Sequence, residues 1–144
     1  MATTLRVAEP PASWLTDTAP PQGDLPDLNV WLSLVLAEHP HHAAALRYWS
    51  GMAEPMAQGQ RLWFCRSTML GLVRLLSQPK LMGDGALNLV QAHSVYRDLR
   101  SQPSVGFLAD HEGADHTLPD LLALELPARL WTDAWLAATA QAAG

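Results

Sequence analysis

Residues 25–36, LPDLNVWLSLVL, decide how the chain begins to fold. They predict the end of a short strand, an acidic turn, and the first turns of an amphipathic helix. The helix is indicated by apolar side chains at the spacing that places them on one face of a helix buried against a core. That apolar stripe comprises Leu28, Trp31, Leu32, Val35 and Leu36.

Asp27 stands where the strand would end, and Asn29 follows where a helix would be capped. A carboxylate at the carboxyl end of a strand, beside a helix N-terminus, is a common place for a metal or polar ligand in open α/β sheets. Asp and Asn are also preferred N-cap residues, so capping alone explains both side chains equally well. On this stretch alone, both interpretations stay open.

Composition narrows the class of protein. A chain of 144 residues suggests one domain with a real hydrophobic core. With 49% hydrophobic and 16% charged residues, it is too apolar for a disordered protein and too weakly charged for a long coiled coil. The net charge of −5 disfavours broad, nonspecific adhesion to nucleic acid, although an enzyme that touches RNA through a local basic patch is not excluded.

The apolar runs, the N-terminal sequence and the cysteine content together predict a cytoplasmic protein that is not embedded in a membrane. No apolar run approaches the roughly 20 residues that span a bilayer, and the N-terminus lacks the apolar segment of a secretory signal. The single cysteine, Cys65, excludes an internal disulfide framework and fits a reducing compartment. We expect Cys65 to be a small core residue rather than a nucleophile, because no base lies beside it in the sequence.

Proline divides the chain into two parts. Residues 1–24 are rich in proline, which fixes φ and donates no hydrogen bond, so an extended arm is expected there. Residues 25–144 form the predicted folded domain. Within it, runs at 61–65 and 104–108 have the length of strands, and helical patterns follow each run. This alternation indicates an α/β domain with a mainly parallel sheet.

Several local details of that domain are also predicted. Residues 51–59 read as a loop, Ser67 or Thr68 as the N-cap of a helix, and Thr132 as the N-cap of a last helix over 133–143. In the helix over 87–99, the side chains available for burial are Leu89, Val90, His93, Val95, Tyr96 and Leu99. In the second helix they are Ala44, Ala45, Tyr48 and Trp49.

Two carboxylates share one context, since Asp27 and Asp133 each open a predicted helix. If the fold brings them together, they can hold Mg²⁺ or Mn²⁺, which favour oxygen ligands and keep several waters. Such an ion polarises a phosphoryl oxygen and lowers the pKa of a bound water, as phosphodiester hydrolysis requires. The alternative is that each carboxylate only complements a helix dipole, worth about 0.3–1 kcal/mol.

Three segments carry a resemblance to a known family: LPDLNVWLSLVLAEHPHH, FCRSTMLGLVRLLSQPKLMG and LWTDAWLAATAQAAG. In this order they resemble a PIN-domain ribonuclease of the VapC toxin type. The resemblance implies a three-layer α/β/α fold and a Mg²⁺-dependent endoribonuclease that hydrolyses RNA. It also implies a cognate VapB-like antitoxin and a homodimer.

The resemblance assigns roles to individual residues. Asp27 and Asp133 match the family's acidic positions, and they are the predicted catalytic residues and metal ligands. Asn29, Thr68 and Thr132 lie next to matched positions and would support the site by hydrogen bonding. Arg74, on the polar face of its helix, would contact RNA phosphate or pair with an acidic residue near Asp27.

Two departures from the family pattern matter. The family has a further acidic residue near the start of the helix after 61–65, whereas residues 67–70 contain none. Related sequences also continue into a strand with a Thr-x-Asp motif, so we expect the last strand to be missing here. Asp110 or Asp115 could substitute as a ligand. The alternative function is therefore a truncated or degenerate PIN domain that binds protein without catalysis.

The histidines at 39, 41 and 42, with Glu38, invite a second metal hypothesis because residues three and four apart share a helix face. Pro40 interrupts any helix there, and the resemblance places the run in a turn between two helices. The turn is the favoured interpretation.

Overall fold

A computed structural model describes residues 21–144 and has an α/β architecture. Its sheet contains three strands in the order β1–β2–β3, all parallel: β1 (Gly23–Asp24), β2 (Arg61–Cys65) and β3 (Val105–Leu108). The predicted parallel sheet and the two predicted strand runs are therefore confirmed. Residues 1–20 of the predicted arm lie outside the described residues.

The first strand starts earlier than predicted, because Gly23 and Asp24 belong to the sheet and not to an arm. The Gln22 carbonyl accepts hydrogen bonds from the Arg61 N–H at 2.9 Å and from the Trp63 indole N–H at 2.9 Å. Gly23 has φ of 117°, and a Cβ there would lie 2.0 Å from the Arg61 carbonyl oxygen. Only glycine allows this close approach of β1 to β2.

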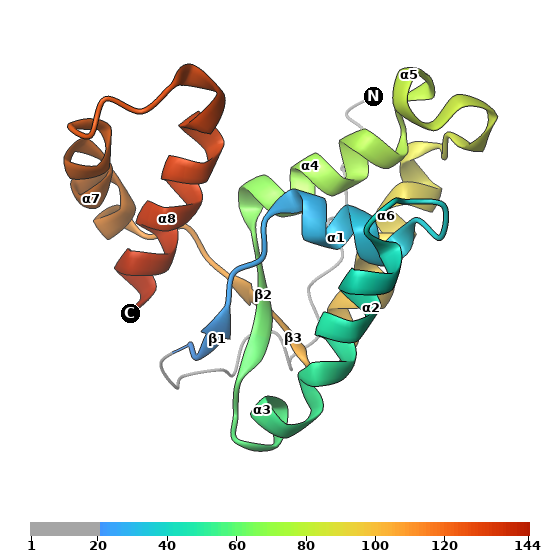
Figure 1. The fold of residues 1–144 in the computed structure, drawn as a ribbon, viewed down its shortest axis with the longest axis horizontal. Helices are drawn as coiled ribbons and strands as arrows, with labels where there is room; N and C mark the ends of the chain where they lie inside the picture. Colours follow the sequence, from blue (N-terminus) through green and yellow to red (C-terminus); the bar gives the residue numbers. More distant parts are fainter. Residues whose placement is uncertain (1–20) are drawn as a thin grey trace, which may run out of the picture.

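Eight α-helices are found among residues 21–144 (Figure 1). Short 3₁₀ turns, η2 (Gly83–Gly85) and η3 (Ala128–Leu130), precede α6 and α8. The helices are α1 (Leu28–Val35), α2 (His42–Gly51), α3 (Ala53–Ala57), α4 (Arg66–Leu76), α5 (Pro79–Met82), α6 (Leu89–Arg100), α7 (Glu112–Leu122) and α8 (Trp131–Ala143).

Helix α3 corrects the predicted loop over 51–59. Its Pro55 is the third residue of the helix, within the first turn, where a missing N–H breaks no helical hydrogen bond. Met52, the residue just before the helix, is buried in the core. None of the helices among the described residues is long and apolar enough to cross a membrane.

One face of the sheet carries the main hydrophobic core. Leu62 and Phe64 of β2 are fully buried there beneath α1, α4 and α6. The Trp31 ring stacks on Phe64 with centroids 3.8 Å apart, and Tyr96 meets Phe64 edge-on at 5.0 Å. The buried members of this core are Trp31, Leu32, Met52, Leu62, Phe64, Leu72, Leu76, Ala92, Tyr96 and Val105.

The predicted burial of α6 and α2 needs correction. Leu89 and Val90 are 67% and 80% exposed, and His93 is also exposed, whereas Ala92 and Tyr96 are buried. The apolar stripe of α6 thus faces the core along its Ala92–Tyr96 side, which leaves its first turn in solvent. In α2, Ala45 is buried, Ala44 is exposed, and Tyr48 and Trp49 are half-buried.

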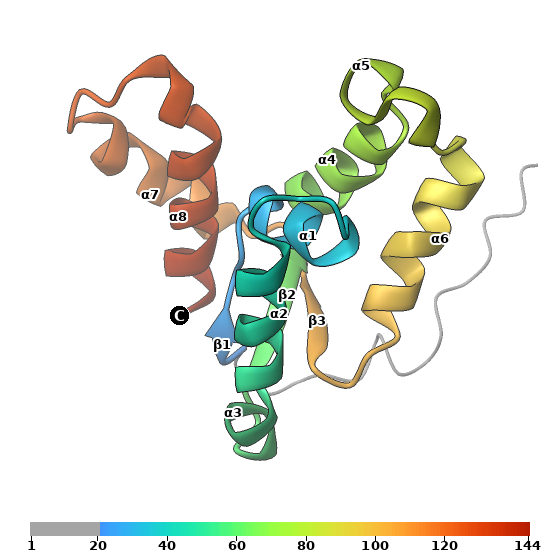
Figure 2. The same cartoon turned by 45° about the vertical axis from the view of Figure 1, so that its right-hand side comes forward.

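The opposite face of the sheet lies under α7 and α8, so that the domain has three layers (Figures 1 and 2). Trp63 and Cys65 alternate with Leu62 and Phe64 along β2 and are buried on this second face. The Trp63 ring lies over Gly106 of β3, where a Cβ would be 2.4 Å from the ring. This layering agrees with the predicted α/β/α arrangement, and no fourth strand is found among residues 21–144.

We predict that Gly106→Ala lowers the free energy of unfolding by about 1–3 kcal/mol, because the new methyl group must displace the buried Trp63 ring. Urea denaturation measures this. Gly51→Ala is the matched control, since nothing lies within 4 Å of its added methyl group. Equal stability of the two variants would contradict the packing described for β3.

Candidate functional site

Asp27 forms the N-cap of α1. Its backbone is extended (φ −62°, ψ 157°). Its Oδ1 accepts a hydrogen bond from the Leu28 N–H at 2.6 Å, and its Oδ2 accepts one from the Asn29 side-chain amide at 3.0 Å. Capping is therefore confirmed for Asp27, while Asn29 lies inside the helix and orients the carboxylate. Each carboxylate oxygen keeps a further lone pair for another ligand.

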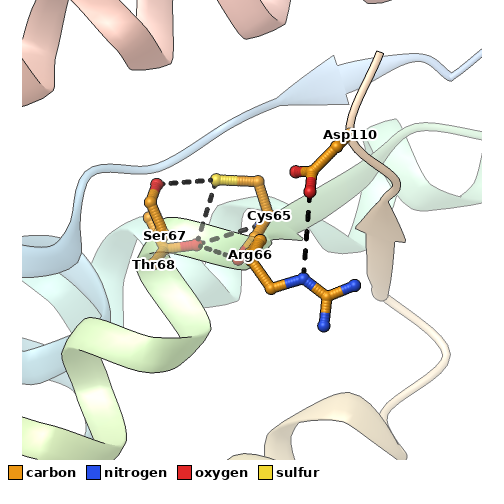
Figure 3. Close-up of polar contacts among 5 residues, drawn as sticks. All are labelled: Cys65, Arg66, Ser67, Thr68 and Asp110. Carbon is orange, nitrogen blue, oxygen red and sulfur yellow. Dashed lines mark hydrogen bonds and ion pairs between the residues drawn. The ribbon is translucent and has the colours of Figure 1, made fainter.

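The N-terminus of α4 lies at the end of β2, and Cys65 is its N-cap. Thr68 is the third residue of the helix, so the predicted cap was misplaced. Its hydroxyl oxygen accepts a hydrogen bond from the Cys65 N–H at 3.0 Å (Figure 3). Cys65 is 1% exposed, as expected for a core residue, and its Sγ lies 3.2 Å from the Ser67 hydroxyl oxygen. Thr68 thus fixes the backbone at the start of α4.

Helices α1 and α4 come into close contact beside Asp27. A Cβ at Gly71 of α4 would lie 2.7 Å from the side chain of Leu28, the residue after Asp27. Glycine at position 71 therefore allows the two helices to pack closely. Ser67 lies one turn before Gly71 on the same face of α4.

Asp133 lies in the first turn of α8 and is exposed. The predicted N-cap Thr132 is wrong, because α8 begins at Trp131, Leu130 is the capping residue, and no side chain caps the helix. Asp133 shares a helix face with Leu136 and Ala140. Ala140 lines a cavity of about 320 Å³ together with Leu25, which lies two residues before Asp27.

Neither predicted metal ligand lines this cavity, whose α8 residues, Ala140 and Ala143, lie toward the C-terminal end of the helix. Helix α8 runs from the carboxyl side of the sheet toward β1 (Figure 1), so its first turn, like the start of α1, lies toward the carboxyl end of the strands. Among residues 21–144, no three His, Cys, Asp or Glu side chains are grouped so that they could hold a metal ion. The pairing of Asp27 with Asp133 stays a prediction.

Two arginines lie in different places around α4. Arg66 follows β2 directly, lies 4.0 Å from the Asp110 carboxylate, and sits 5.6 Å from the centre of the Phe107 ring (Figure 3). Both members of this ion pair are more than half exposed, so it contributes little to stability. Arg74 instead lines a groove of about 550 Å³ between α4 and α6. The sequence pattern singles out Arg74 and not Arg66, although Arg66 alone stands at the carboxyl end of a strand.

Asp110 and Asp115 line a cleft of about 450 Å³ between the start of α4 and α7. Ser67 and Trp135 also contribute to this cleft, so it opens beside the N-terminus of α4. Asp110 and Asp115, the two substitute ligands considered from sequence, therefore face α4 at the carboxyl side of β2. Whether they bind metal stays a prediction.

The histidine run forms the turn between α1 and α2, as favoured from the sequence. The His39 Nδ1 accepts a hydrogen bond from the His41 N–H at 3.1 Å and lies 3.0 Å from the Ser33 hydroxyl oxygen. His42 Nδ1 lies 2.7 Å from the Ser33 carbonyl oxygen, an acceptor in the last turn of α1. These rings fix the geometry of the turn by satisfying backbone groups.

Tyr48 joins α2 to β1. Its hydroxyl donates a hydrogen bond of 2.5 Å to Oδ2 of Asp24, the last residue of β1. Burial of the phenol, together with its hydrogen bond to the Asp24 carboxylate and the negative charge of that group, raises the pKa of Tyr48 well above its usual value. Tyr48 therefore remains a hydrogen-bond donor at neutral pH and helps to hold β1 in place.

Comparison with known proteins shows a similarity to a ribonuclease. The chain is 29% identical over 123 residues to the protein named Ribonuclease VapC41 in two strains of Mycobacterium tuberculosis, CDC 1551 and H37Rv. The aligned region covers 82% of this chain and 82% of each relative. No protein-family model matches the chain. The similarity supports the resemblance to VapC ribonucleases, and the observed fold is compatible with it.

We predict that the free energy of unfolding of the wild type falls more steeply at alkaline pH than that of Tyr48→Phe. Above the usual tyrosine pKa of about 10, the unfolded chain ionises Tyr48 while the folded protein keeps it protonated, so stability is lost as pH rises. Urea denaturation at about pH 8 and about pH 11 measures the difference. Equal losses in the two proteins would show that the bond to Asp24 is not maintained in solution.

Proposed function

We propose that the chain is a metal-dependent endoribonuclease that hydrolyses RNA phosphodiester bonds, acting as the toxin of a VapBC-type toxin–antitoxin system. The observation that carries this proposal is the position of Asp27. It follows β1 and caps α1, whose first residue packs closely against the middle of α4 at Gly71, in a chain that is 29% identical to Ribonuclease VapC41. Asp27 thus lies where open α/β sheets commonly bind ligands.

The backbone around Asp27 suits an anionic substrate. The N-termini of α1 and α4 carry partial positive charge and present N–H groups, which favour phosphate oxygens. Arg66, at the carboxyl end of β2, supplies a cation in the same region. In this proposal the helix ends and Arg66 position the RNA phosphate, while Asn29 holds the Asp27 carboxylate in one orientation.

The donor groups fit Mg²⁺ or Mn²⁺. Both are hard ions that bind carboxylate oxygens, and Mg²⁺ is often held by one or two carboxylates with water and substrate phosphate completing its shell. Asp27 and Asp133 would hold the ion, and Thr68 would support the site indirectly, because its buried hydroxyl bonds the Cys65 backbone and fixes the start of α4. When bound, the metal supplies positive charge that polarises the phosphoryl group.

The proposed partners are an RNA substrate, a VapB-like antitoxin and a second copy of this chain, all in the cytoplasm. Support for a protein partner comes from the groove between α4 and α6, where large apolar side chains reach the solvent. Leu70 and Leu89 line this groove and are 57% and 67% exposed. Exposed apolar surfaces of this kind often mark interaction sites.

A second candidate function is a non-catalytic, PIN-like binding module. It is favoured by the lack of an acidic residue over 67–70 and by the absence, among the described residues, of a three-ligand metal cluster. Titration calorimetry with Mn²⁺ separates the two functions. Binding that is lost in Asp27→Asn supports the nuclease, whereas an intact wild type that takes up no Mn²⁺ supports the binding module.

We predict that Asp27→Asn lowers Mg²⁺-dependent cleavage of cellular RNA by about two orders of magnitude or more, because several kcal/mol of charge stabilisation is lost with the carboxylate. Asparagine is also a good N-cap, so the fold should be retained. Gel analysis of RNA fragments measures the rate, with Asp133→Asn expected to behave similarly.

Asp120→Asn, on the exposed side of α7, is the matched control and should cleave like the wild type. The nuclease proposal is wrong if the wild type cuts no RNA, or if Asp27→Asn and the control cut equally fast.

A further inference from the structure

A second cavity lies immediately beside Asp27, between α1 and α2. It has a volume of about 310 Å³. Small side chains at Ala44 and Ala45 face Val30 across the two helices and leave the space unfilled. The residues that line it are Asn29, Val30, Ser33, His41, Ala44, Ala45 and Tyr48.

The walls of this cavity are fixed. Tyr48 is held by its hydrogen bond to Asp24, and the turn that carries His41 is held by the bonds of His39 and His42. Both the turn that joins α1 to α2 and the part of α2 that carries Tyr48 are therefore held in place. Pre-formed cavities with mainly apolar walls and a few fixed polar groups are typical ligand sites.

Asn29 connects this cavity to the predicted metal site. One N–H of its amide donates to Asp27, which fixes the plane of the amide group. The structure describes no protein partner for its Oδ1 or its second N–H, and the residue is exposed. An amide held in this way can pair with the edge of a nucleobase.

The remaining lining consists of side chains of the kinds that contact nucleobases. Val30, Ala44 and Ala45 provide apolar walls, while Tyr48 and His41 provide aromatic rings of the types that stack on unpaired RNA bases. We infer that the cavity between α1 and α2 binds a nucleobase of single-stranded RNA, next to the proposed metal ligand Asp27. This inference rests on the proposed function and adds a site of base selectivity to it.

The test compares two substitutions on adjacent residues of α2. Ala44→Phe fills the cavity, and Ala43→Phe is the matched control, because Ala43 is exposed and does not line the cavity. Both proteins are titrated with short fluorescent homopolymers of U, C, A and G, with Ca²⁺ present to limit cleavage. We expect Ala44→Phe to weaken binding of the preferred homopolymer about tenfold, as for loss of one stacked base, and the control to bind like the wild type.

Cleavage by the wild type in Mg²⁺ is measured in parallel, so that the two proposals can fail separately. If the wild type cuts RNA but both variants bind each homopolymer as tightly as the wild type does, the inference is overturned and the proposed function stands. If the wild type cuts nothing but Ala44→Phe still loses base-selective binding, the cavity is confirmed and catalysis is not. If Ala44→Phe changes only the sedimentation of the protein, the cavity receives a second copy of the chain and the inference is wrong.

Discussion

The position of Asp27 depends on the carbonyl group of Gln22. That oxygen accepts hydrogen bonds from the Arg61 N–H and from the Trp63 indole, and these bonds hold a strand of only two residues against β2. Gly23 permits the approach, and Tyr48 holds Asp24 from α2. A short strand gains little from its own ladder, so anchoring from neighbouring elements is what brings the chain to Asp27 at a defined place.

Much of the fold follows from patterns that are local in the sequence. The helical spacing of apolar residues after Asp27 and the apolar run at 61–65 predict α1 and β2 closely, because burial of one face or of a whole strand dictates their composition. Cys65 is buried as expected. These elements are set by the side chains they contain.

Other features depend on contacts that a local pattern does not encode. Gly23 admits β1 to the sheet through its close approach to Arg61, and Pro79 opens α5 within three residues of the end of α4. Thr68 and Thr132 both have the chemistry of N-caps, yet each helix begins earlier. A helix begins where the preceding strand or turn ends. Several residues near that point can have the side-chain chemistry of an N-cap, so the sequence alone does not select one of them.

The strands of the sheet also differ in how well their backbone amide protons are protected from exchange with solvent. Strand β2 is paired on both edges, whereas β1 pairs on one side only among the described strands. Amide protons of β2 are therefore expected to exchange with solvent only through global opening, while those of β1 exchange through small local fluctuations. Strand β3 is also an edge, but it has four residues and β1 has two, so the strand that leads to Asp27 is the weaker edge of the sheet. The geometry around this carboxylate is therefore sensitive to any group that packs against β1.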